Sequence, residues 1–99
     1  MRLVVVTECL AAPGWEDRLR TALEALIEPS LEAPGCLAYQ PYADPNRPAR
    51  MVVVEEWEDE GALARHRDGA PYRHACDVLD LVLARPVTAR RLVPARSGS

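Results

Sequence analysis

The spacing of hydrophobic positions changes along the chain and predicts where strands and helices lie. Residues 2–10 are rich in β-branched side chains and precede a Pro-Gly pair at 13–14, which predicts a strand. The apolar run 3–6 does not alternate with polar residues, which is typical of a strand covered on both faces. Residues 15–32 place apolar side chains every three or four positions, which predicts an amphipathic helix. Because Pro29 lacks a backbone N–H, we expect the last turn of this helix to kink or loosen.

The second half of the chain continues with strands followed by helical segments. Strands are predicted over 36–42 and 50–58, on either side of a turn-rich connector. The later strand opens with another unbroken apolar run, 51–54, so it is also expected to be covered on both faces. Asp59 is a suitable N-cap for the helix that follows. The remaining elements are helices over 60–67 and 72–83 and a strand over 87–93.

The predicted order of elements is β-α-β-β-α-β, which is typical of an α+β, ferredoxin-like fold. In this fold both helices of the motif pack on one face of a four-stranded antiparallel sheet. The doubly apolar strands then leave a second sheet face without cover, and a second copy packed face to face is the simplest cover. We therefore predict a homodimer through sheet-to-sheet packing. Residues 1–94 are predicted to form a single domain, and 95–99 to form a frayed polar tail.

Composition narrows the classes of function. All 12 basic residues are arginine, which excludes lysine Schiff bases and a P-loop lysine. The net charge of −3 argues against nucleic acid as a partner. Apolar runs fall far short of the ~20 residues that span a bilayer, and the N-terminus resembles no signal peptide. An odd number of cysteines (Cys9, Cys36 and Cys76) without a CxxC pair fits free thiols, and we expect a soluble, cytoplasmic protein without a membrane partner.

The most distinctive stretch is 54–66, where a strand ends in Glu-Glu-Trp-Glu and a helix follows with Ala-Leu-Ala-Arg-His. An acidic-Ala-Pro-Gly-Cys segment at 32–36 and a Pro-Tyr pair at 71–72 flank it in the order of the predicted elements. Together these segments resemble the antibiotic biosynthesis monooxygenase (ABM) family of dimeric α+β barrels. The resemblance implies a pocket between helices and sheet, in which a small quinol or polycyclic phenol is oxidised by dioxygen. It implies no metal and no cofactor.

Five residues are candidates for the site that this resemblance implies. His66 titrates near neutrality and is the candidate base, with Glu56 as a second catalytic candidate. Trp57, Tyr72 and His74 are candidates for binding the substrate. Structural roles stay open for each of them, because His66 could anchor its helix and His74 could lie on a solvated face. Side chains alternate along a strand, so Glu56 and Trp57 are expected on opposite faces unless the strand is bulged.

Two other functions stay open. One is a small-ligand-binding protein with the same pocket and no turnover, which is favoured by apolar Val53 where some polyketide-oxidising members present a polar amide. The other is an isomerase or lyase that acts on a small carbonyl compound, with His66 moving the proton. A metal site is not predicted, since His66 and His74 lack a metal-binding spacing. Haem-degrading relatives have an asparagine, a tryptophan and a histidine where this chain has Thr7, His66 and Cys76, so haem chemistry is not expected.

Overall fold

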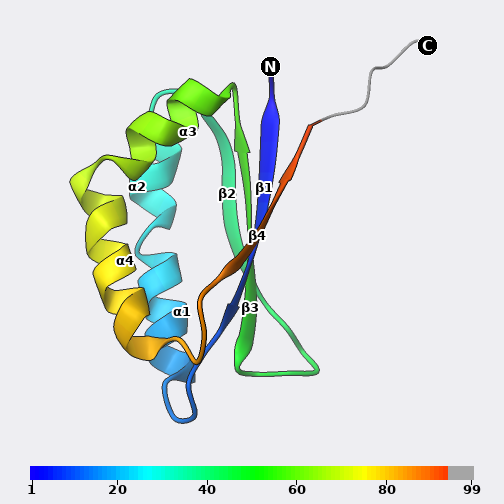
Figure 1. The fold of residues 1–99 in the computed structure, drawn as a ribbon, viewed down its shortest axis with the longest axis vertical. Coiled ribbons are helices and arrows are strands. Elements are labelled where there is room, and N and C mark those ends of the chain that lie inside the picture. Colours follow the sequence, from blue (N-terminus) through cyan, green and yellow to red (C-terminus); the bar gives the residue numbers. More distant parts are fainter. Residues whose placement is uncertain (94–99) are drawn as a thin grey trace.

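Residues 1–93 are described by the computed structural model, which places every helix on one face of a four-stranded antiparallel sheet (Figure 1). The strands are β1 (Leu3–Leu10), β2 (Cys36–Ala43), β3 (Arg50–Trp57) and β4 (Thr88–Leu92). The helices are α1 (Glu16–Glu24), α2 (Ile27–Glu32), α3 (Glu60–Arg67) and α4 (Ala70–Val82). The strand order is β2-β3-β1-β4, with neighbouring strands antiparallel. This arrangement confirms the predicted α+β, ferredoxin-like fold.

Two prolines explain where the helices differ from their predicted bounds. The single helix expected over 15–32 is divided into α1 and α2. The division comes before Pro29, which lies in the first turn of α2, where its missing N–H leaves no intrahelical bond unmade. Likewise, α4 begins at Ala70 rather than at Tyr72, because Pro71 is accommodated in its first turn.

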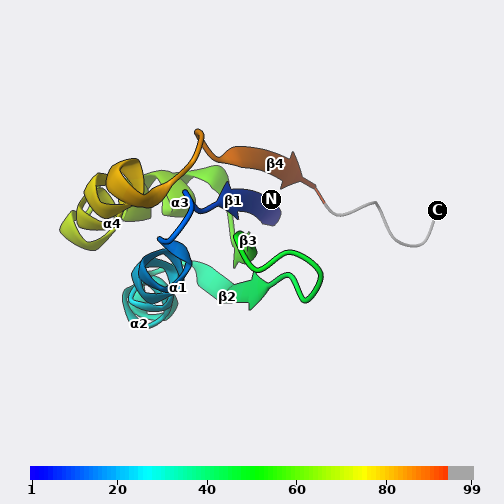
Figure 2. The ribbon, with the colours of Figure 1, turned by 90° about the horizontal axis from the view of Figure 1, so that it is seen from below.

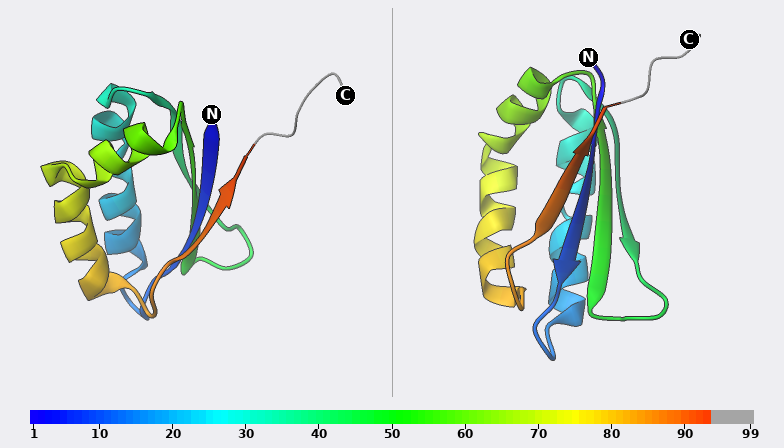
Figure 3. Two further views of the ribbon diagram at one scale, coloured as in Figure 1. Left: turned by 45° about the horizontal axis from the view of Figure 1, so that its top comes forward. Right: turned by 45° about the vertical axis from the view of Figure 1, so that its right-hand side comes forward.

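The sheet has one face under the helices and one face that residues 1–93 leave without a covering layer (Figures 2 and 3). Regular pairing of β1 with β3 alternates the side chains between the two faces. The helix-facing apolar positions of these strands are buried: Leu3, Val5, Cys9, Met51, Val53 and Trp57. The other face presents Val4, Val6, Val52 and Val54, which are only half-buried. Both strands therefore carry apolar side chains on both faces, as their unbroken runs predicted.

The turn into β2 brings the chain close to α3. Gly35 has a φ of +87°, and a Cβ added there would lie 2.5 Å from the Cβ of Ala62. Only glycine allows both the backbone conformation and this close approach. Asp59 caps α3 as predicted, because its carboxylate accepts a hydrogen bond of 2.8 Å from the backbone N–H of Ala62.

Within residues 1–93, each helix is too short or too polar to cross a membrane. All three cysteines are free, as their number and spacing predicted. The frayed tail predicted over 95–99 lies outside the described residues.

Candidate active site

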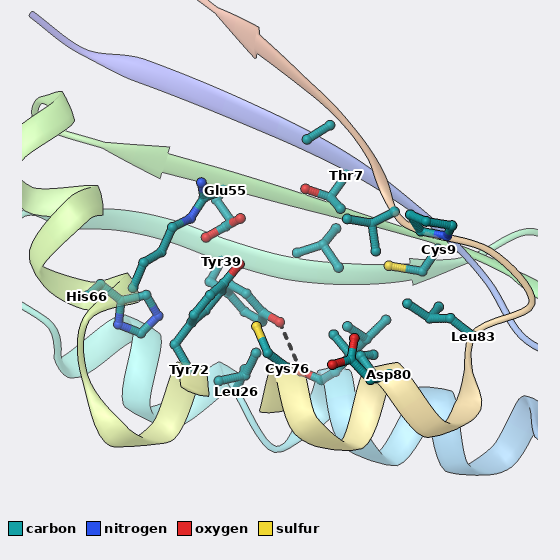
Figure 4. Close-up of a pocket in the computed structure, with 17 residues that line it drawn as sticks. Thr7, Cys9, Leu26, Tyr39, Glu55, His66, Tyr72, Cys76, Asp80 and Leu83 are labelled. Carbon is teal, nitrogen blue, oxygen red and sulfur yellow. Dashed lines mark hydrogen bonds between the residues drawn. The ribbon is translucent and has the colours of Figure 1, made fainter. Parts of the chain in front are cut away.

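A cavity of about 310 Å³ lies between the sheet and the helices α3 and α4 (Figure 4). Much of its wall is apolar and includes Leu26, Val53, Leu79 and Leu83. The polar groups of the wall come from five elements: Thr7 and Cys9 on β1, Tyr39 on β2, Glu55 on β3, His66 and Arg67 on α3, and Tyr72, Cys76 and Asp80 on α4. Apolar walls with a few converging polar groups are typical of small-molecule sites.

His66 reaches this cavity because of its position on α3. The Asp59 cap sets the start of the helix, and helical spacing then places Ala62, Leu63 and His66 on the buried face. The imidazole packs against two aromatic rings, with centroids 5.0 Å from the ring of Trp57 and 5.9 Å from that of Tyr72. His66 thus lies in the cavity wall, in contact with the rings of Trp57 and Tyr72.

The electrostatic setting of His66 favours its neutral form. Burial lowers the pKa of His66, and the nearby Arg67 guanidinium lowers it further. The ring is therefore neutral at pH 7 and is able to accept a proton.

A buried hydroxyl orients the His66 ring. Ser30 on α2 has no exposed surface, and its Oγ lies 3.2 Å from His66 Nε2. When Nε2 carries the proton and donates to Ser30 Oγ, Nδ1 keeps a free lone pair and becomes the basic nitrogen.

Glu55 is a buried carboxyl group in the wall of the cavity. Its side chain is 6% exposed, and its Oε1 accepts a hydrogen bond of 3.3 Å from Trp57 Nε1. Burial raises the pKa of Glu55, while the bond from Trp57 and the charge of Arg67 oppose this rise. Together with His66, this carboxyl group gives the cavity two groups able to exchange protons.

The structure brings together three of the five residues predicted from the sequence. His66 and Tyr72 line the cavity, and Trp57 lies beneath it in contact with both His66 and Glu55. The other two lie elsewhere in the molecule.

Glu56 and His74 do not reach this cavity. Glu56 projects from the opposite face of the sheet, where it forms an ion pair of 3.0 Å with Arg2. The reason is the strand alternation noted above, since β3 has no bulge in its pairing with β1. His74 lines a second cavity of about 350 Å³ with Arg18 and other residues of α1 and α4.

Of the site members that sequence reasoning overlooked, two had a signal in the sequence. The alternation that separates Glu56 from Trp57 places Glu55 on the same face as Trp57. Ser30 continues the helical stripe of Leu23 and Leu26, which marks it as a polar residue at a core position. For Arg67 no local signal existed, because it belongs to a run of charged residues.

Among residues 1–93, no group of three or more His, Cys, Asp or Glu side chains lies close enough together to hold a metal ion.

The fold and the site define a class of small α+β domain with a cavity between helices and sheet. A sequence profile described as "Antibiotic biosynthesis monooxygenase" matches residues 2–78. The chain belongs to the antibiotic biosynthesis monooxygenase (ABM) family, as the sequence resemblance predicted.

Two relatives are similar over nearly the whole chain. The protein named "Putative monooxygenase Rv0793" of Mycobacterium tuberculosis is 27% identical over 97 residues, covering 98% of this chain and 95% of that protein. The solved structure of Rv0793 covers 100% of both chains with a TM-score of 0.91. The crystal structure of PA3566 from Pseudomonas aeruginosa is 27% identical with a TM-score of 0.90, covering 96% of this chain and 95% of that chain.

Proposed function

We propose that this protein is a monooxygenase that oxidises a small quinol or polycyclic phenol with dioxygen, without a metal or flavin. The observation that carries the proposal is the apolar cavity with neutral His66 and buried Glu55 on its wall. Membership of the ABM family and similarity to a protein named as a monooxygenase support this class of reaction.

In the proposed reaction the substrate supplies the electrons. His66 Nδ1 accepts the proton of a substrate hydroxyl, since Ser30 occupies Nε2. The deprotonated, electron-rich ring then reduces dioxygen. One oxygen atom enters the ring, the other leaves as water, and the ring is left as a quinone. The apolar wall excludes water from the reacting ring.

Oxygen uptake by metal-stripped protein, measured with a panel of hydroquinones and polycyclic phenols, tests this proposal. We expect uptake that survives a chelator and falls about 10²- to 10⁴-fold in His66→Ala, because a positioned base contributes on that order. The matched control is His74→Ala, which removes the histidine of the second cavity and should leave uptake unchanged. Uptake that the chelator abolishes, or that both variants reduce alike, would contradict the proposal.

Binding without turnover is a second candidate, and one observation favours it. Val53 is an apolar residue of the cavity wall, on the strand where some polyketide-oxidising members of the family present a polar amide. A thermal shift with one of these phenols and no oxygen uptake would support binding alone. Proton transfer on a small carbonyl compound, lost in His66→Ala with binding intact, would instead support an isomerase or lyase.

We further propose that the protein is a homodimer through its open sheet face. Val4, Val6, Val52 and Val54 form a continuous apolar band there, since β1 and β3 are central neighbours in the sheet. Leu92 on β4 extends the band and is 50% exposed. A contiguous apolar surface of this kind marks an interface, and a second copy offers the same surface in return.

A further inference from the structure

We propose that Arg67 is an anion-binding residue, and that the cavity binds an aromatic compound through an ionised oxygen held by the Arg67 guanidinium. The inference rests on the proposed function only in taking an aromatic compound as the occupant. The oxygen belongs either to a phenolate or to a carboxylate on the ring, and the two sources are separated by the test below.

The first observation is that Arg67 is unpaired in a cavity wall. Its Nε is buried and has no hydrogen-bond partner within the part of the chain that the structure describes. Arg2, Arg20, Arg50 and Arg91, by contrast, each lie within 4.0 Å of a carboxylate. A buried donor on a charged group is costly unless an acceptor satisfies it, so an orphan of this kind requires an explanation.

The second observation is the position of the guanidinium. The Arg67 Cζ lies 5.6 Å from the centroid of the Tyr72 ring, and both residues line the cavity. Stacking on an aromatic face holds the guanidinium in place and leaves its donors free for an acceptor in the plane. His66 and Arg67 line the same cavity, so an oxygen that gives its proton to His66 would become an anion within the cavity that Arg67 lines.

Glu55 does not serve as the permanent counter-ion of Arg67. No ion pair between them forms within 4.0 Å in the described chain, and Glu55 accepts its hydrogen bond from Trp57 instead. Burial also raises the pKa of Glu55, which opposes its ionisation. The positive charge of the cavity is therefore left for a ligand, and the apolar wall strengthens its attraction for an anion.

The test uses a nitronaphthol, whose neutral and ionised forms absorb at different wavelengths. Its ionisation is followed spectroscopically when it is free, bound to the unaltered protein, and bound to Arg67→Gln. We expect the ligand bound to the unaltered protein to ionise about one to two pH units lower than free ligand. This shift corresponds to a ten- to hundredfold preference for the anion, which is typical of a charge-assisted hydrogen bond. In Arg67→Gln the preference should disappear.

Matched variants isolate the effect of the guanidinium. Arg73→Gln removes an exposed arginine of α4 and should keep the full shift, whereas Arg67→Lys should keep part of it. Apart from Arg67 itself, the titratable groups that line the cavity are unchanged in all three variants: Cys9, Tyr39, Glu55, His66, Tyr72, Cys76 and Asp80. Circular dichroism establishes that each variant is folded, and the shift in the unaltered protein tests the inference without any variant.

A second comparison separates the two sources of the anion. Naphthoate is compared with naphthamide, its neutral analogue of similar shape, in a binding titration. Tighter binding of naphthoate than of naphthamide shows that a ring carboxylate is accepted, while a preference confined to the nitronaphtholate shows that the site selects a phenolate. Equal affinity for the ionised and neutral forms would overturn the inference. So would an equal loss of affinity for the ionised and the neutral ligand in Arg67→Gln, or the failure of every probe to bind.

These outcomes are independent of oxygen chemistry. An ionised aromatic held by Arg67 without oxygen uptake would support the anion site and refute the proposed monooxygenase. Oxygen uptake that is insensitive to Arg67→Gln would support the proposed monooxygenase and refute the anion site.

Discussion

His66 owes its chemical properties to side chains that are distant in the sequence. Ser30, which bonds its Nε2, lies 36 residues earlier on another helix. Trp57, whose ring it contacts, belongs to the end of β3. The histidine is thus positioned by packing between elements, and its residue type alone did not reveal that it lines a cavity.

The bond between Ser30 and His66 should contribute measurably to stability. In Ser30→Ala the buried Nε2 loses its partner, and we expect the free energy of unfolding to fall by about 1–3 kcal/mol. In a His66→Ala background the same substitution should cost less, because the partner is already absent. Urea unfolding of the four proteins measures this coupling. Equal costs in both backgrounds would show that the two side chains do not interact.

Glu55 should make stability depend on pH in a defined direction. Burial raises its pKa above 4.5 in the folded protein, so the folded state binds more protons than the unfolded state between 4.5 and the folded pKa. Stability contributed by Glu55 is therefore present below about pH 4.5 and is lost as the pH rises through that interval. Urea unfolding from pH 4 to 7 should show this loss in the unaltered protein but not in Glu55→Gln. The same decrease in both proteins would refute the assignment.

At the scale of elements, the fold depends on where α3 meets the turn into β2. Gly14 and Gly35 share a positive φ, +85° and +87°, but only Gly35 faces a neighbour at the position of a Cβ. Alanine at either site incurs the backbone cost of the left-handed conformation, while at Gly35 it also collides with Ala62.

This difference predicts unequal effects of the same substitution. Gly14→Ala should lower the free energy of unfolding by about 1–2 kcal/mol, from backbone conformation alone. Gly35→Ala should cost about 1–3 kcal/mol more, because an added methyl group forces α3 away from the turn. The double variant Gly35→Ala with Ala62→Gly should recover part of this difference. Equal thermal stability of the two single variants would rule out the close approach as the cause.

The elements themselves were largely predictable, and the exceptions involve proline. Strand and helix patterns identified the four strands and, apart from the division of the first helix, the helices. The division between α1 and α2 was missed, since a proline indicates that a helix is interrupted but not on which side the chain restarts. For α4, Pro71 was taken as a break, whereas it fits the first helical turn.

At the scale of the whole molecule, the sheet has two faces and one helical layer. Figure 2 shows the helices gathered on one side of the strands. The open side carries the valine band of β1 and β3 described above, beside charged pairs such as that of Arg50 with Glu8. An apolar band edged by charges suits the proposed two-fold interface, because interfaces commonly have an apolar centre and a polar rim.

The proposed dimer predicts a specific effect of charge on this face. Val54 pairs with Val6 at the centre of the sheet, so Val54→Glu would bury two unpaired carboxylates in each dimer. We expect the dissociation constant to rise about a hundredfold or more. Leu81→Glu, at a leucine of α4 that is 74% exposed, is the matched control and should remain dimeric. Sedimentation velocity at micromolar concentration measures both, and a monomeric mass for the unaltered protein would refute the dimer.

The sequence by itself determined the order of strands and helices, the doubly apolar central strands and the family, because these depend on local periodicity and on motifs at fixed spacing. Among the candidate site residues that it suggested, His66 and Tyr72 line the cavity. Only the tertiary structure decided which side chains share the cavity. It set Glu55 in place of Glu56, bonded Ser30 to His66, and left Arg67 unpaired in the cavity wall. These relations depend on packing between elements distant in the chain. The periodicity within one element does not predict which side chains of other elements contact it.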